Sequence, residues 1–327
     1  MRLRQLGRTG TTVSEIGFGC GPTAGLMLYG TPGQRQMTVA RALDLGINYF
    51  DTAPGYGNSI SEINLGTTLW QLGATPVIAT KVALSVEDLT DIGSAIRKSV
   101  EQSLRNLRID RIPVIQLHNR IARTRASKAN LGAAALLSVD DVLGPNGVVA
   151  ALKALRRQGM VEVLGCSAYG GEMLAVEQVI ESGAFDIVSV NYSVLNTTAW
   201  TTQTAGSLSR DYGKIGARAA SAGAGIVALR VLEGGVLVDE VEPHQRTDMR
   251  TTPEHDVLVE RARIFRLRLA GVDSGLSTVA IRFALSNPEV SCVLIGLSNV
   301  RQVEEAVKNA SLGPLSDDLM STVLSAV

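Results

Sequence analysis

Cysteine and histidine are scarce in this sequence, which holds three of each among 327 residues. Cys20, Cys166 and Cys292 stand in apolar or small-residue surroundings without a CxxC spacing, which argues against a disulfide framework or a thiolate metal site. The histidines form no HExxH pattern. We therefore expect buried free thiols and no protein-bound metal.

The sequence also lacks an excess of either charge and any long apolar run. Lys plus Arg and Asp plus Glu both number 31, and no basic cluster is interleaved with aromatic residues. Neither nucleic acid nor an anionic membrane is therefore an expected partner. No apolar run approaches the roughly 18 residues of a membrane span, and the first residues lack a signal-peptide pattern. We expect a soluble, cytoplasmic protein that acts on a small molecule. The sequence does not indicate its oligomeric state.

Hydrophobic residues make up 45% of the chain, enough for one large core. Short apolar runs alternate with amphipathic stretches, a rhythm typical of β–α units. The predicted strands are residues 16–19, 48–51, 77–80, 114–117, 163–166, 187–190, 225–229 and 293–295. The predicted helices are residues 34–45, 61–72, 91–107, 146–158, 171–182, 208–222, 276–286 and 300–310.

This alternation predicts α/β architecture, a single (β/α)8 TIM barrel that spans residues 1–327 as one domain. An open doubly wound sheet is the alternative, but it would require a glycine-rich turn leading straight into a helix, whereas the glycines at 17–21 precede Pro22. Two short segments around the turn GRTG predict an N-terminal β-hairpin that plugs one end of the barrel. Long βα loops at 119–145, 195–207 and 232–254 should build a pocket on the catalytic face.

Four reactive side chains stand at or just past predicted strand ends, namely Asp51, Tyr56, Lys81 and His118. Each has an ordinary structural explanation by itself: a helix cap or turn, a loop aromatic, a solvated strand end and a core histidine. In a barrel, however, all four would face the same mouth. Their joint placement favours a catalytic constellation.

The chemistry of carbonyl reduction suits this set. Hydride addition to a carbonyl builds negative charge on oxygen, so a proton donor is required there, and Tyr56 is the candidate. Lowering the pKa of a tyrosine by about three units requires roughly 4 kcal/mol. We expect the ammonium of Lys81 to supply this by favouring the phenolate, with Asp51 holding the lysine charged. His118 would hydrogen-bond the substrate oxygen or relay a proton.

These residues carry a resemblance to the aldo-keto reductases along nearly the whole chain. The matching stretches include FDTAPGYGNSISEINLG, TKV, QLHN, ALRRQGMVEVLGCSAY and VLIGLSNVRQVEEAV. The resemblance implies the (β/α)8 fold, NADP(H) bound across the barrel mouth without a Rossmann unit, with NAD(H) possible, and the roles given above for Asp51, Tyr56, Lys81 and His118. The substrate would be a small carbonyl or alcohol compound, an aldehyde, a ketone or a sugar.

By resemblance, a Ser-Asn pair and a glutamine should hold the nicotinamide carboxamide, but this chain has Ser167, Ala168 and Ser189 there. We expect the nicotinamide to be held less firmly, or through Asn191 or backbone groups. Arg230 and Arg301 are expected at the phosphates. The predicted coenzyme-binding residues are Gly19, Cys20, Asp51, Ser167, Ser189, Leu229, Arg230, Leu232, Gly234, Gly235, Gly296, Leu297, Ser298, Arg301, Gln302 and Glu305. The predicted substrate-binding residues are Gly21, Tyr29, Tyr56, His118, Asn119 and Trp200.

Two alternatives remain open at this level. The chain could be a non-catalytic relative, an NADP(H)-binding regulatory subunit on the same fold, although the four reactive side chains argue against this. It could also be a barrel hydrolase or lyase that uses carboxylates, but no second carboxylate stands at a predicted strand end. The substrate and the direction of the reaction are not evident from the sequence.

Overall fold

The computed structural model describes residues 1–125, 134–202, 210–238, 253–269, 272 and 274–326. Among these residues, parallel strands close into a barrel in the ring order β10-β11-β12-β3-β4-β5-β6-β9. Their bounds are β3 Ile16–Gly19, β4 Tyr49–Asp51, β5 Val77–Val82, β6 Ile112–Leu117, β9 Val161–Ser167, β10 Ile187–Asn191, β11 Gly225–Leu229 and β12 Val290–Gly296. The predicted (β/α)8 barrel and each of its eight predicted strands are confirmed.

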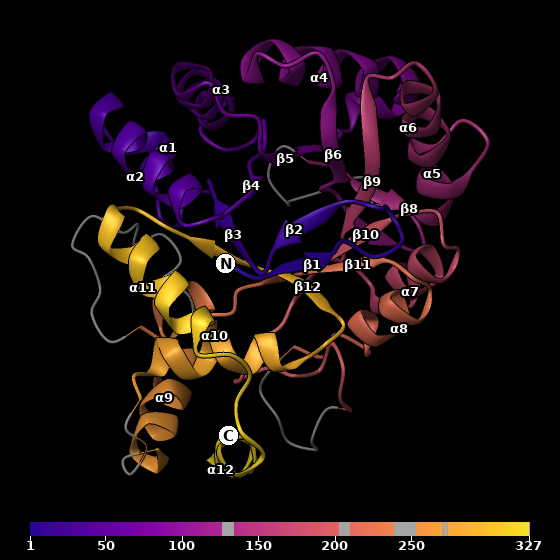
Figure 1. Cartoon of the computed structure of the whole chain (residues 1–327). Helices are drawn as coiled ribbons and strands as arrows, with labels where there is room; N and C mark the ends of the chain where they lie inside the picture. The colour runs from indigo at the N-terminus through magenta and orange to yellow at the C-terminus, as the bar shows by residue number, and fades with distance from the viewer. Residues whose placement is uncertain (126–133, 203–209, 239–252, 270–271, 273, 327) are drawn as a thin grey trace.

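Helices surround this barrel, as Figure 1 shows. The eight expected helices are α2 Pro32–Asp44, α3 Ile60–Leu72, α4 Ile92–Leu107, α6 Val148–Arg157, α7 Met173–Glu181, α8 Ile215–Ser221, α10 Leu276–Ser286 and α11 Val300–Ser311. Local signals fix their first turns. Thr31 and Gln34 form a reciprocal capping box at the start of α2, and Asp91 accepts a hydrogen bond from the Ser94 backbone at the start of α4.

Several elements lie outside the predicted set. They are α1 Leu26–Tyr29, η1 Glu87–Thr90, β7 Arg120–Ala122, β8 Leu136–Ser138, α5 Val139–Leu143, η2 Glu233–Gly235, α9 Pro253–Arg268 and α12 Asp317–Ala326. The loops predicted at 119–145 and 232–254 are therefore partly regular structure, whereas the described residues of the loop at 195–207 form no helix or strand. Residues 126–133, 203–209 and 239–252 of these loops, including the predicted start of the 208–222 helix, lie outside the described residues.

The N-terminal hairpin closes one end of the barrel, as predicted. Strands β1 Leu3–Gln5 and β2 Thr12–Ser14 pair antiparallel and cross the barrel strands in Figure 1. Leu6 and Val13 are fully buried, and they share a hydrophobic cluster with inward residues of the barrel strands such as Tyr49 and Val114. The burial of this cluster fixes the hairpin to the barrel.

The three cysteines are free and buried, as expected.

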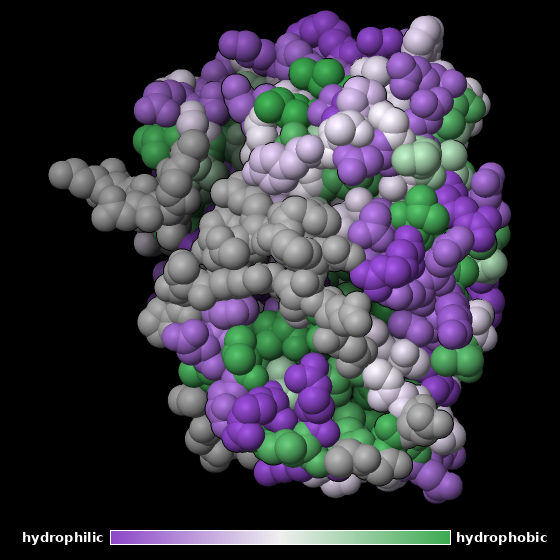
Figure 2. Space-filling model, turned by 90° about the vertical axis from the view of Figure 1, so that its left-hand side faces the viewer, coloured by the Kyte–Doolittle hydropathy of each residue, from purple (hydrophilic) through white to green (hydrophobic). Residues whose placement is uncertain are grey.

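On the face shown in Figure 2, hydrophobic and hydrophilic residues are interspersed. Within the described part of the chain, no helix combines the length and the apolar character required to cross a membrane.

Candidate active site

An ion pair lies inside the barrel, near the carboxyl ends of its strands. Lys81 of β5 donates a hydrogen bond from Nζ to the carboxylate of Asp51 on β4, and a second one to the Thr52 carbonyl at 2.8 Å. Both side chains of the pair are buried, with 3% and 4% of Asp51 and Lys81 exposed. Burial disfavours the charged lysine, but Asp51 and then Tyr56 outweigh it and raise the pKa of Lys81. The lysine is therefore held as an ammonium.

Tyr56 lies directly beside this ammonium. Lys81 Nζ lies 4.9 Å from the centroid of the Tyr56 ring. Gly21 follows the first barrel strand, and a β-carbon at this glycine would come within 3.5 Å of the tyrosine ring. Gly21, which the sequence predicts as a substrate-binding residue, therefore lies beside the Tyr56 ring.

The start of α3 anchors the Tyr56 loop. Ser61 donates a hydrogen bond to the Cys20 carbonyl at 2.9 Å and shares a second one of 2.8 Å with Thr52. The neighbouring Glu62 is fully buried and accepts hydrogen bonds from Thr80 at 2.6 Å and Asn106 at 2.9 Å. A buried carboxylate with two donors is well compensated, so it can fix α3 to β5 and α4.

Gly66, the last residue of the matching stretch FDTAPGYGNSISEINLG, has a packing role. A β-carbon at Gly66 would come within 2.6 Å of the backbone at Asn106 and Leu107. Helix α3 can therefore approach the end of α4 only with glycine at this point. The motif that carries the family resemblance is in large part the scaffold that holds Tyr56 at the mouth.

The pKa of Tyr56 corrects one expectation. The sequence predicts that Lys81 lowers this pKa below its ordinary value, but in the structure it is raised. Burial of the hydroxyl is the largest cause, and the lowering by Lys81 offsets only part of it. At neutral pH the hydroxyl therefore carries its proton, as a proton donor must.

His118 completes the group. It follows β6, and its ring meets that of Tyr56 edge-on at a centroid distance of 6.1 Å and an interplanar angle of 84°. The Tyr169 ring also meets the His118 ring edge-on, at a centroid distance of 6.3 Å. Burial, with a smaller contribution from Lys81, lowers the pKa of His118 to about 3. The imidazole is neutral at physiological pH, so it can donate or accept a hydrogen bond but is not a reservoir of acid.

Sequence reasoning missed Gln116, which lies in the same polar layer. This fully buried residue of β6 donates from Nε2 to Asp51 Oδ2 at 2.9 Å and accepts at Oε1 from Ser189 at 2.6 Å. A polar residue inside the apolar strand run VIQL was the signal that could have identified it. Residues of four strands are thereby joined across the barrel.

The three other residues predicted to bind substrate lie elsewhere or have other partners. Asn119 is buried, and its amide bonds the backbone of Leu84 in both directions at 2.8 Å and the Ala135 carbonyl at 2.9 Å. These hydrogen bonds give Asn119 a structural role, because they join the backbone at Leu84 to the backbone at Ala135. Tyr29 is 60% exposed on α1.

Trp200 packs against residues of three other segments. Its ring packs on Tyr192 at a centroid distance of 4.5 Å, and its indole nitrogen donates to Glu289, which directly precedes β12. The same ring lies against Gly216 at the start of α8. These contacts lie outside the ring of barrel strands, and none of them is with Tyr56 or His118.

The region expected to hold the nicotinamide contains one unusual atom. Ser167, at the end of β9, is 3% exposed, and its Oγ has no hydrogen-bond partner among the described residues. Ser189 lies beside it in register on β10. The side-chain amide of Asn191 donates a hydrogen bond to the Tyr212 hydroxyl at 2.8 Å, so Asn191 already has a partner within the protein. A buried, unpaired hydroxyl favours a polar ligand group at this point, because leaving it unmatched is unfavourable.

A cavity of about 580 Å³ extends outward from the ends of β11 and β12. Nine predicted coenzyme residues line it: Arg230, Leu232, Gly234, Gly235, Gly296, Leu297, Arg301, Gln302 and Glu305. Sequence reasoning did not identify Thr23, Ala24, Ser277, Thr278, Lys308 and Asn309, which also line it. Gly19 and Leu229 lie at the ends of β3 and β11, and Cys20 follows Gly19 and donates its backbone N–H to the Asp51 carbonyl at 2.8 Å.

The start of α11 is already organised in this cavity. Asn299 caps the helix by accepting from the Gln302 backbone at 3.0 Å, and Gln302 accepts from both the backbone and the hydroxyl of Ser298 at 2.9 Å. Arg301 pairs with Glu305 at 2.9 Å. The guanidinium of Arg301, which the sequence predicts to bind a phosphate, is therefore already paired with a carboxylate.

The loop after β11 has an unusual backbone. Arg230 and Glu233 have positive φ values of 55° and 47°, and Gly234 and Gly235 follow with 69° and 101°. Glu233 is buried and accepts a hydrogen bond from the hydroxyl of Ser193, which lies after β10. This contact fixes two loops of the mouth to each other.

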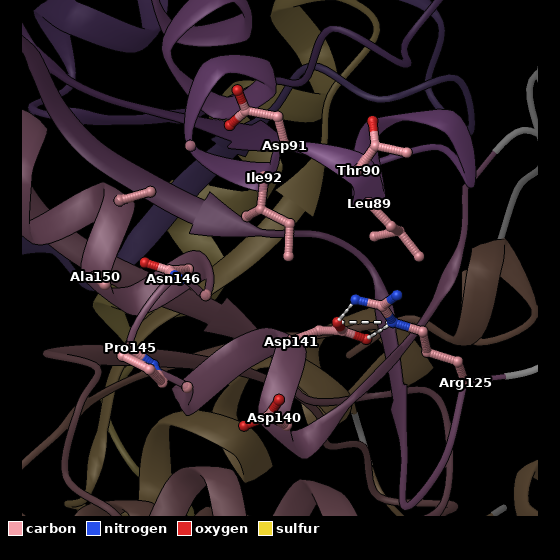
Figure 3. A pocket seen from close by; sticks show the side chains of 14 residues that line it. Leu89, Thr90, Asp91, Ile92, Arg125, Asp140, Asp141, Pro145, Asn146 and Ala150 are labelled. Atoms are coloured by element: carbon pink, nitrogen blue, oxygen red, sulfur yellow. Dashed lines mark hydrogen bonds and ion pairs between the residues drawn. The ribbon is translucent and has the colours of Figure 1, made fainter.

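A second cavity, of about 620 Å³, lies apart from this site (Figure 3). It is lined by residues around the starts of α4 and α6, and its walls include Asp91, Asn146 and the pair formed by Arg125 and Asp141. None of Asp51, Tyr56, Lys81 or His118 lines it.

The chain is similar in sequence to proteins of known activity. The chain is 27% identical over 313 residues to L-galactose dehydrogenase of Arabidopsis thaliana, covering 94% of this chain and 87% of the relative. It is 24% identical to D-threo-aldose 1-dehydrogenase of a Pseudomonas species, covering 93% of this chain and 91% of the relative.

A solved structure, the holo form of an aldo-keto reductase from Bacillus halodurans, superposes with a TM-score of 0.74 at 22% identity. That comparison covers 100% of this chain and 96% of the other, and it supports the fold. The model of the aldo/keto reductase family matches residues 15–327, and the chain therefore belongs to that family.

Proposed function

We propose that this protein is an NADP(H)-dependent oxidoreductase that transfers a hydride between the nicotinamide and a carbonyl or alcohol substrate, with Tyr56 as general acid and base. The observation that carries the proposal is the position of Lys81, paired with Asp51 and 4.9 Å from the Tyr56 ring. A buried ammonium beside a tyrosine and a neutral histidine is suited to proton exchange with a substrate oxygen.

The described residues fit a nicotinamide coenzyme. The Ser167 hydroxyl, which has no partner among the described residues, can hydrogen-bond a carboxamide. The cavity of about 580 Å³ is lined by Arg230, Arg301 and glycines whose backbone a phosphorylated ligand can approach closely. The coenzyme, when bound, supplies or accepts the hydride. NADP(H) is the expected coenzyme. NAD(H) is the alternative, because Arg301, the expected partner of a phosphate, already forms an ion pair with Glu305.

Five residues then have defined roles in the reaction. In the reductive direction Tyr56 donates its proton to the substrate oxygen, and the ammonium of Lys81 stabilises the phenolate that remains. Asp51 keeps Lys81 charged and in position. The neutral His118 hydrogen-bonds the substrate oxygen, and Gly21 leaves room for the substrate beside the tyrosine ring.

The relatives named above act on sugars, which directs the choice of substrates to test. The purified protein should be assayed with aldoses, aldehydes and ketones, and with the matching alcohols, by following the absorbance of the reduced nicotinamide with either coenzyme. Turnover of at least one class with a preference for NADP(H) is expected. Coenzyme binding without turnover of any substrate would favour a non-catalytic regulatory subunit instead.

A further inference from the structure

Gln116 connects the ion pair of the active site to the far side of the barrel. Its strand β6 pairs with β5 so that Lys81 lies opposite Gln116, and with β9 so that Gln116 lies opposite Gly165. Its hydrogen-bond partners are Asp51 on β4 and Ser189 on β10, at 2.9 and 2.6 Å. The side chain thus reaches past β9, the strand that lies between β6 and β10.

Gly165 makes this reach possible. A β-carbon at Gly165 would come within 2.7 Å of Gln116 Cγ, closer than real β-carbons approach. Because glycine stands there, the Gln116 side chain passes over β9 to meet Ser189. Any larger residue at 165 would push the amide away from this position.

The chemistry of the partners fixes the direction of each hydrogen bond. The carboxylate of Asp51 forms an ion pair with Lys81 and can only accept, so the amide nitrogen of Gln116 must face it. The amide oxygen of Gln116 then faces Ser189, whose single hydroxyl proton is required for that bond. Toward the barrel mouth, Ser189 can offer only lone pairs.

Ser167 has the opposite property. It lies opposite Ser189 in the β9–β10 register, and its buried Oγ has no partner among the described residues. Its proton therefore remains available to a ligand. The two serines present an acceptor and a donor side by side, although Ala168 and Ser189 depart from the amide side chains that the family resemblance predicts there.

We propose that Gln116 sets the polarity of the carboxamide site, so that Ser189 accepts from the carboxamide NH2 of the coenzyme and Ser167 donates to its carbonyl. This inference rests on the proposed function, because it takes the coenzyme to be a nicotinamide nucleotide. It makes Gln116 a positioning residue that acts through Ser189, and it replaces the expectation of a loosely held nicotinamide end.

The test compares two coenzymes that differ only at the carboxamide. The 3-acetylpyridine analogue of NADP+ keeps the carbonyl but has a methyl group in place of the NH2. Dissociation constants for NADP+ and this analogue would be measured by isothermal titration calorimetry on the wild type and on Ser189→Ala, Ser167→Ala and Gln116→Met. A loss of folded protein lowers the fraction of binding sites for both ligands alike, so it leaves the ratio of the two constants unchanged.

Ser189→Ala should weaken binding of NADP+ by about fivefold and change binding of the analogue by less than about twofold, because one neutral hydrogen bond is lost from NADP+ alone. Ser167→Ala should weaken both ligands by similar factors. Gln116→Met releases the Ser189 proton and should reduce the preference for NADP+ over the analogue.

The outcomes separate this inference from the function on which it rests. Wild-type protein that binds neither ligand would overturn the proposed function and this inference with it. Normal NADP+ binding, with Ser189→Ala weakening both ligands equally or Gln116→Met leaving their ratio unchanged, would overturn the inference alone.

Discussion

Lys81 Nζ lies 4.9 Å from the centroid of the Tyr56 ring while it donates to the carboxylate of Asp51. The ammonium therefore interacts with two neighbours in different ways. Asp51 holds it in the charged state inside the barrel, and Tyr56 receives its stabilising effect when the hydroxyl loses a proton. Replacement of Lys81 and replacement of Asp51 separate these two relationships.

Replacement of Lys81 by Met should raise the pKa of Tyr56 further. Burial and Asp51 both raise this pKa, and Lys81 is the group that lowers it. In the oxidative direction, which requires the phenolate, the limb of the pH–rate profile should move to higher pH. The profile should be measured under conditions in which a deuterated substrate shows that chemistry limits the rate. An unmoved limb would remove Lys81 from the proton-transfer network.

Replacement of Asp51 by Asn should destabilise the fold. It leaves the ammonium of Lys81 buried without its counter-charge, a change that typically costs about 3–5 kcal/mol of unfolding free energy. The matched control is the double variant Asp51→Asn with Lys81→Met, which removes both charges and should recover much of the loss. Urea unfolding measures both, and equal losses in the single and double variants would contradict this account of the pair.

His118 should make stability depend on pH below its ordinary pKa of 6.5. Its pKa in the folded protein is lowered to about 3, so between these values the unfolded chain binds a proton that the folded protein does not. The stability is present above pH 6.5 and is lost as the pH falls toward 3, by up to about 1.4 kcal/mol per pH unit.

The variant His118→Gln lacks this contribution. Between about pH 7 and pH 5, wild-type protein should therefore lose roughly 2 kcal/mol more than the variant in urea unfolding. A difference between the two proteins that stays constant with pH would show that His118 titrates normally in the fold.

Tyr49 offers a test of the barrel interior. It is fully buried, and its hydroxyl has no hydrogen-bond partner among the described residues. Replacement by Phe removes an unmatched polar group without leaving a cavity, so the free energy of unfolding should stay equal or rise by about 1 kcal/mol. A fall of similar size would reveal a partner for this hydroxyl.

The regular rhythm of apolar residues predicted the barrel strands well, because each strand is buried and bounded by polar loops. Helix α9 was missed, since its apolar residues do not gather on one face and the sequence offers no helical periodicity there. Helix α8 begins later than expected because Thr198 holds the preceding residues, bonding the backbone of Tyr212 at 3.0 Å and that of Lys214 at 2.9 Å. Such tertiary contacts are not visible in local sequence.

The candidate site was predictable where reactive residues stand at strand ends, and less so where contacts cross the barrel. Gln116 was overlooked because its partners lie 65 and 73 residues away in the chain. Trp200 was assigned to the pocket from its place in a loop, yet its contacts with Tyr192 and Glu289 lie outside the barrel. The net direction of the Tyr56 pKa also required the structure, since burial is a property of the fold.

The replacement of Tyr56 by Phe tests the central claim most directly. The ring and its contact with His118 are kept, and only the hydroxyl that donates the proton is lost. Single-turnover oxidation of bound NADPH by an aldehyde or aldose substrate of the wild type would be measured, with coenzyme affinity determined on the same preparation. The account predicts unchanged coenzyme binding and a rate about 10²- to 10⁴-fold lower. A near-normal rate with coenzyme bound as in the wild type would contradict it.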